Sequence, residues 1–165
     1  MHKYVLLLAF SAIFFSSCKI NPNLQGKGVD LVQGIWEEAP VLYQSELLQY
    51  TRRDFKFTCD SFYVTLNTYS KVNLYEDSCY NNGYWKEYAK GTYVAQNDTL
   101  FLTGTFTKAN FKQKISGCYR NGQYIEAFVI KNHTSDSLYL ESLQQHLPVT
   151  LALKEKLICT PKALY

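Results

Sequence analysis

Asp60-Ser61-Phe62-Tyr63-Val64 is a five-residue stretch that returns twice along the chain, each time 38 residues later. Every copy has an aspartate, a small hydroxyl residue, and then an apolar, an aromatic and an apolar residue. That order is typical of a strand leaving a tight turn. The regular spacing indicates a repeated structural unit and predicts three equivalent strands. The other copies are Asp98-Thr99-Leu100-Phe101-Leu102 and Asp136-Ser137-Leu138-Tyr139-Leu140.

A second strand enters each of these turns, so the repeat predicts three hairpins. The entering strands are alternating or aromatic runs at residues 52–58, 90–96 and 124–131. Residues 34–38 and 149–157 add one strand before the first hairpin and one after the last. Long connections at 40–49, 73–84 and 109–121, with a shorter one at 143–148, then share the end opposite the tight turns.

Eight antiparallel strands in simple succession favour an all-β, up-and-down barrel, because closure removes both unpaired edges. An open sheet or a sandwich is the alternative. Residues two and four places after each aspartate are apolar and are expected to face the interior. Towards the loop end this row becomes Leu66, Gly104 and Ser142, so the lumen either holds a ligand or only tapers. The candidate ligand-binding residues are Arg53, Phe55, Leu66 and Phe106.

Gly34-Ile35-Trp36 resembles the Gly-x-Trp signature that opens the first strand of lipocalins, and residues 29–33 resemble their short helical lead. The resemblance implies an eight-stranded barrel with Trp36 buried at the short-turn end. Thr134, Asp136 and Tyr139 only loosely resemble a second lipocalin motif. The arginine that packs over the lipocalin tryptophan is missing, since only Lys154 and Lys156 are available there, and a lysine head does not stack on an indole as guanidinium does.

Four further strings resemble a group of small bacterial lipoproteins, some of which carry the automatic name fumarate hydratase. They are Asn-Leu-Gln-Gly-Lys-Gly at 23–28, Phe-Lys-Phe-Thr-Cys-Asp at 55–60, Trp-Lys-Glu-Tyr-Ala-Lys-Gly at 85–91 and Lys-Gln-Lys-Ile-Ser-Gly-Cys-Tyr at 112–119. Fumarases resemble one another in a Gly-Ser-Ser loop or a cysteine-ligated iron-sulfur site, and this sequence has neither. The resemblance therefore implies an envelope lipoprotein, and not that enzyme.

The first residues have the pattern of a lipoprotein signal peptide: a basic start, an apolar run at 4–15, and Phe15-Ser16-Ser17 before Cys18. This run is too short to span a bilayer, which needs about 20 residues. We expect cleavage after residue 17, lipid on Cys18, a tether at 18–30, the barrel at 31–160 and a tail at 161–165. Lys19 is not the aspartate associated with inner-membrane retention, so we expect the outer membrane, facing the periplasm.

The other four cysteines are an even set in an exported chain, which predicts two disulfides. Cys59 precedes the first repeated turn, and Cys159 follows the last strand to that same end. Cys79 and Cys118 lie in two long loops at the other end. A strand of eight to ten residues spans about 26 to 33 Å, whereas bridged Cα atoms lie within roughly 7 Å. The pairs should therefore be Cys59–Cys159 and Cys79–Cys118.

Composition narrows the function further. Net charge is only +3, with both signs interspersed, so nucleic acid is not an expected partner. The three histidines are isolated, so neither a metal site nor a cofactor is expected. No nucleophile with a nearby base is found, and Glu87 is interpreted as a cross-strand partner of lysine. Two functions remain: binding a small apolar or amphipathic ligand in the lumen, or a filled barrel that contacts another envelope component through Tyr63, Phe101 and Tyr139.

Overall fold

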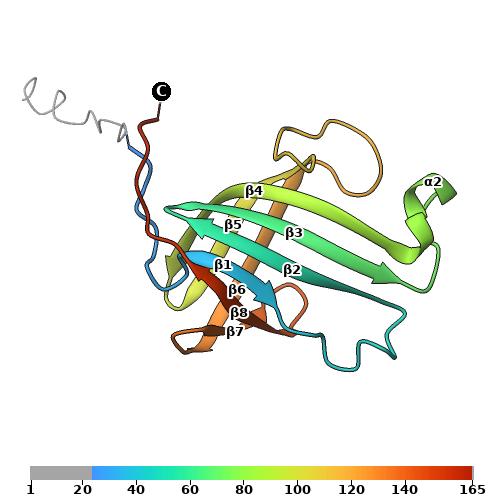
Figure 1. Cartoon of the computed structure of the whole chain (residues 1–165), viewed down its shortest axis with the longest axis horizontal. Helices are drawn as coiled ribbons and strands as arrows, with labels where there is room; N and C mark the ends of the chain where they lie inside the picture. Colours follow the sequence, from blue (N-terminus) through green and yellow to red (C-terminus); the bar gives the residue numbers. More distant parts are fainter. Residues whose placement is uncertain (1–23, 165) are drawn as a thin grey trace, which may run out of the picture.

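The computed structural model describes residues 24–164 as one closed barrel of eight antiparallel strands (Figure 1). The strands follow one another around the barrel in sequence order, and β1 pairs with β8 to close it. The predicted up-and-down topology is confirmed. The strands are β1 (Gly34–Glu38), β2 (Gln49–Thr58), β3 (Ser61–Ser70), β4 (Tyr84–Gln96), β5 (Thr99–Thr107), β6 (Gln123–His133), β7 (Ser137–Ser142) and β8 (Pro148–Lys156).

The repeated aspartates lie in the short turns of the three predicted hairpins. Between β4 and β5 the turn residues Asn97 and Asp98 both have positive φ, 47° and 58°. This mirror-image turn matches the right-handed twist of paired strands, and asparagine and aspartate tolerate it well. The long loops lie at the other end, where one carries the short helices α2 (Asp77–Tyr80) and η2 (Asn81–Gly83).

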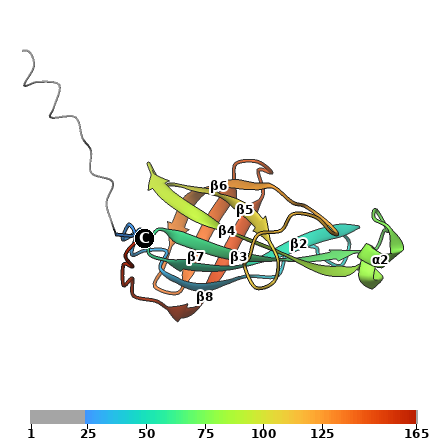
Figure 2. The same cartoon turned by 90° about the horizontal axis from the view of Figure 1, so that it is seen from above.

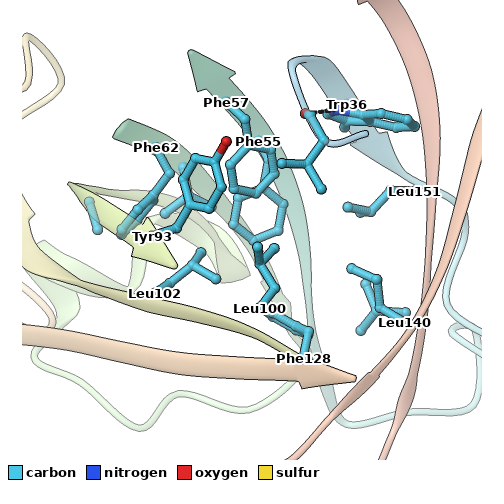
Figure 3. Packing of buried hydrophobic residues seen from close by; sticks show 14 of the residues in the cluster. Trp36, Phe55, Phe57, Phe62, Tyr93, Leu100, Leu102, Phe128, Leu140 and Leu151 are labelled. Atoms are coloured by element: carbon cyan, nitrogen blue, oxygen red, sulfur yellow. Dashed lines mark hydrogen bonds between the residues drawn. The ribbon is translucent and has the colours of Figure 1, made fainter. Parts of the chain in front are cut away.

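The barrel interior is built from the alternating apolar rows that the repeat predicts. Phe62, Leu100 and Leu138, two residues after each aspartate, are all at most 1% exposed. Trp36 is also buried at this end, and its indole nitrogen donates to the Val32 carbonyl oxygen at 2.8 Å (Figure 3). Full burial of these large side chains is the main source of the barrel's stability.

Both ends of the described chain are fastened to the closed end of the barrel. The predicted Cys59–Cys159 disulfide is present and ties the segment after β8 to the β2–β3 turn. That segment in turn pairs with the amino-terminal segment through a bridge between Leu24 and Ala163 and a 2.8 Å bond from the Gln25 amide to the Lys162 carbonyl (Figure 1).

Two local expectations need correction. Residues 29–33 form a turn and not a helix. Two backbone hydrogen bonds, each from an amide to the carbonyl three residues earlier, have lengths of 3.2 and 3.3 Å. Strands β2 and β4 also begin earlier than predicted, at Gln49 and Tyr84, and with β3 they extend beyond the other strands (Figure 2). Tyr69 explains this extension, because its ring packs between Tyr50 and Tyr84 at 5.0 and 4.8 Å and stabilises the extra pairs.

The expected signal peptide, Cys18 and the first part of the tether lie outside the described residues. Within residues 24–164 no helix has both the length and the apolar character needed to cross a bilayer.

Candidate functional site: the barrel interior and its mouth

All four residues predicted to line the lumen point into the barrel. Arg53 and Phe55 come from β2, Leu66 from β3 and Phe106 from β5, and their exposed fractions are 5, 1, 2 and 5%. They pack against other interior side chains. Phe55 meets Phe128 at 6.0 Å, as Figure 3 shows, and Phe106 meets Tyr124 at 5.5 Å. Side chains therefore surround the residues that a lumen ligand would have to contact.

The Arg53 guanidinium lies between two carboxylates. Its terminal nitrogens approach Glu38 of β1 and Glu126 of β6, both at 3.3 Å. The Arg53 amide also donates to Glu38 at 2.8 Å, and the Tyr124 hydroxyl donates to Glu126 at 2.6 Å. The guanidinium charge is thus neutralised inside the protein, although the Nε atom of Arg53 has no hydrogen-bond partner.

Burial and charge act in opposite directions on this cluster. Burial acts to lower the pKa of Arg53, but Glu126 and Glu38 outweigh it and raise that pKa. Burial raises the pKa of Glu38, and the nearby Arg53 only partly offsets the effect. Burial, reinforced by Glu126, raises the pKa of Tyr124 well above its ordinary value. Tyr124 therefore remains a neutral hydrogen-bond donor at physiological pH.

A second ion pair lies at the mouth of the barrel. Arg120, from the loop between β5 and β6, donates two hydrogen bonds to the Glu87 carboxylate of β4, one from Nε at 3.0 Å and one from a terminal nitrogen at 2.8 Å. Its guanidinium also lies 4.9 Å from the Phe106 ring centre, a cation–π contact. The expected pairing of Glu87 with lysine is wrong, because odd-numbered residues of β4 face inwards and Glu87 meets the loop that covers the mouth.

The predicted Cys79–Cys118 disulfide is also present and joins the β3–β4 and β5–β6 loops beside this ion pair. Tyr119, next to Cys118, stacks on Trp85 with ring centres 5.2 Å apart, and Tyr75 meets both rings edge-on. The Tyr119 hydroxyl donates to the Cys79 carbonyl. One covalent bond and one aromatic cluster therefore hold the mouth loops together.

Two hollows lie on the outside of the barrel. The first, of about 330 Å³, is formed by β1, β2 and β3 together with Phe111 of the β5–β6 loop. The second, of about 380 Å³, lies over β6, β7 and β8, where Lys131 pairs with Glu141 at 2.8 Å. Tyr139 lines this second hollow and is 41% exposed, which agrees with its predicted place on the outer face.

The sequence reasoning missed most of the interior charges. Glu38 and Glu126 could have been found, because each is two residues from an inward-facing aromatic residue, Trp36 or Tyr124, on a strand of period two. Arg120 carries no such signal, since it enters the mouth from an irregular loop. Lys154 binds Glu37, and Lys156 donates to the Asp30 carbonyl.

The fold and the interior together define a closed eight-stranded antiparallel barrel whose mouth is filled by paired charges. Among residues 24–164 no group of three or more histidine, cysteine, aspartate or glutamate side chains is placed to hold a metal ion. Comparisons of the chain with protein-family models, with curated proteins and with solved structures found no match.

Proposed function

We propose that this protein is an envelope lipoprotein whose filled barrel is a rigid support for contacts at its outer face and mouth. The observation that carries the proposal is the neutralised Arg53, enclosed by Glu38 and Glu126 where a ligand head group would otherwise bind. A small apolar or amphipathic ligand in the lumen, the other function that the sequence favours, would have to displace these partners and the ring of Phe106.

The cysteines support the proposed location of the protein in the cell envelope. Two disulfides use four of the five cysteines, so Cys18 is the one left for lipid attachment. Disulfides of this kind persist in oxidising compartments such as the bacterial periplasm. A lipoprotein with two or more acyl chains is stably anchored, whereas one chain binds only reversibly. With Lys19 after the lipidated cysteine, we place the protein on the outer membrane, facing the periplasm.

The lipid anchor is tested by labelling cells with palmitate. The wild-type protein should take up the label and Cys18→Ser should lose it. A labelled Cys18→Ser protein, or a mature chain that keeps residues before Cys18, would contradict the anchor.

The filled barrel is tested separately by native mass spectrometry of protein purified from its own envelope. The expected mass is that of the lipidated chain with both disulfides. A small molecule that co-purifies equally with the wild type and with Phe111→Ser would favour the lumen, because that substitution removes a wall of the outer hollow. Such a result would overturn the proposal while leaving the anchor intact.

A further inference from the structure

The amino-terminal segment of the described chain is fixed across the closed end of the barrel. The Gln25 side chain donates to the Ser61 hydroxyl at 2.8 Å, and the Gly26 amide donates to an Asp60 carboxylate oxygen at 3.0 Å. Both acceptors lie where β2 turns into β3. Figures 1 and 2 show this segment at one end of the molecule, with α2 and the tip of the β2–β3–β4 extension at the other. The position of Leu24 relative to the barrel is therefore fixed.

The short tether excludes an orientation in which the other end of the barrel meets the membrane. Six residue steps lead from Cys18 to Leu24, and an extended chain of that length spans at most about 20 to 22 Å. β3 has ten residues and therefore runs about 30 Å from the closed end to the tip of the extension. If the protein stood on that tip, Leu24 would lie beyond the reach of a lipid on Cys18. The closed end is therefore the end that can lie against the bilayer.

The closed end also exposes aliphatic side chains. Leu24, Ile158 and Leu164 are 57, 90 and 59% exposed, and all three lie in the two paired terminal segments. Such side chains gain free energy by leaving water, and the boundary between head groups and acyl chains accepts them. The tether brings this end of the barrel to the bilayer, whereas it gives no such advantage to a soluble partner. A membrane is therefore the occupant that the geometry selects.

Charge does not restrict the kind of lipid. An electrostatic preference for anionic lipids needs a basic cluster, and the described residues of the closed end carry both signs. The lysines there are Lys27, Lys156 and Lys162, and the acidic residues are Asp30, Asp60, Asp98, Asp136 and Glu155. The contact should therefore be apolar and independent of anionic lipid.

We propose that the closed end is a membrane-contacting surface, at which Leu24, Ile158 and Leu164 enter the lipid head-group region while the mouth of the barrel points away from the bilayer. The inference rests on the proposed function, because it needs the lipid on Cys18. It deepens that function, because the mouth is then the end that is free to meet a soluble partner in the periplasm.

The test measures how strongly brominated phosphatidylcholine quenches a tryptophan at either end of the barrel. The intact lipidated protein is reconstituted in vesicles whose acyl chains carry bromine near the head groups, and the signal of Trp36 and Trp85 in the wild type is subtracted. Ile158→Trp reports on the closed end. Leu74→Trp is the matched control, because Leu74 is 69% exposed in the β3–β4 loop at the other end. Ile158→Trp should be quenched at least about threefold more than Leu74→Trp, and equally when phosphatidylglycerol is added.

Adding Leu24→Ser and Leu164→Ser to Ile158→Trp should reduce the quenching about twofold, and an unchanged signal would overturn the role of the aliphatic side chains. Equal quenching of Ile158→Trp and Leu74→Trp would lay the barrel on its side and overturn the end-on orientation. Protein that floats with the vesicles while Ile158→Trp stays unquenched would overturn the contact and leave the anchor intact. Protein that takes up no palmitate would overturn both the anchor and this inference.

Discussion

Replacing Arg53 with methionine should destabilise the barrel severely. The substitution removes a cation from between Glu38 and Glu126, whose side chains are only 6% and 16% exposed. Breaking one side of a buried ion pair typically costs about 3 to 5 kcal/mol, because a charge is left buried without compensation. Domains of this size have about 5 to 15 kcal/mol in total. Urea unfolding followed by the fluorescence of Trp36 and Trp85, with both disulfides intact, measures this loss directly.

Two variants separate the buried charge from the loss of an arginine in general. Arg52→Met is the matched control, since the neighbouring Arg52 pairs with Glu37 on the outer face and donates to the Glu38 backbone carbonyl, and its loss leaves no buried charge and should cost about 1 to 2 kcal/mol. Combining Arg53→Met with Glu38→Gln and Glu126→Gln removes all three charges and should recover most of the stability. A loss below about 1 kcal/mol in Arg53→Met, or a triple variant no better than the single one, would refute the internal neutralisation of Arg53.

Three further predictions concern the pH response, the tryptophan and the loops. Burial raises the pKa of Glu38 above 4.5, so its contribution is most favourable at low pH and is lost as pH rises; wild type should lose stability relative to Glu38→Gln as pH rises above 4.5. Lys154 lowers the pKa of Glu37, so wild type should lose stability relative to Glu37→Gln as pH falls below 4.5, and the same sign in both titrations would contradict the assignment. Trp36→Ala should cost about 3 to 5 kcal/mol in urea unfolding, and a loss within about 0.5 kcal/mol would show that Trp36 is not a core residue. Replacing Cys79 and Cys118 by serine should cost about 4 kcal/mol by loop entropy and speed amide exchange in the mouth loops, whereas unchanged exchange would show that other contacts suffice.

The fold was predictable from sequence because its signals are local and repeated. The aspartate turns fixed three hairpins, and the two-residue period assigned Phe62 and Leu100 to the interior, where they lie. The two disulfides followed because strand length separates the ends of the barrel by far more than a disulfide can span. Each of these inferences needs only neighbouring residues and the geometry of a strand.

The filling of the lumen was not predictable, because it depends on long-range pairing. Arg53 and Glu126 are 73 residues apart, and Arg120 reaches Glu87 across 33 residues from a loop without periodicity. Alternation predicts that Glu126 points inwards but not which cation meets it. The hollow at Phe111 has the same origin, since a loop returns to the outer wall through contacts that no local pattern encodes.

The fastening of both chain ends at the closed end of the barrel determines how the protein would carry tension. A pull on the chain before Leu24 first loads the Gln25–Lys162 backbone bond and the Leu24–Ala163 bridge, whose segments run side by side. From there the load passes along the carboxy-terminal segment to Cys159 and, through the disulfide, to the turn between β2 and β3. Traction on the amino terminus is therefore shared between the end of β8 and the β2–β3 turn, on the two sides of β1, so β1 is not peeled away from its neighbours alone.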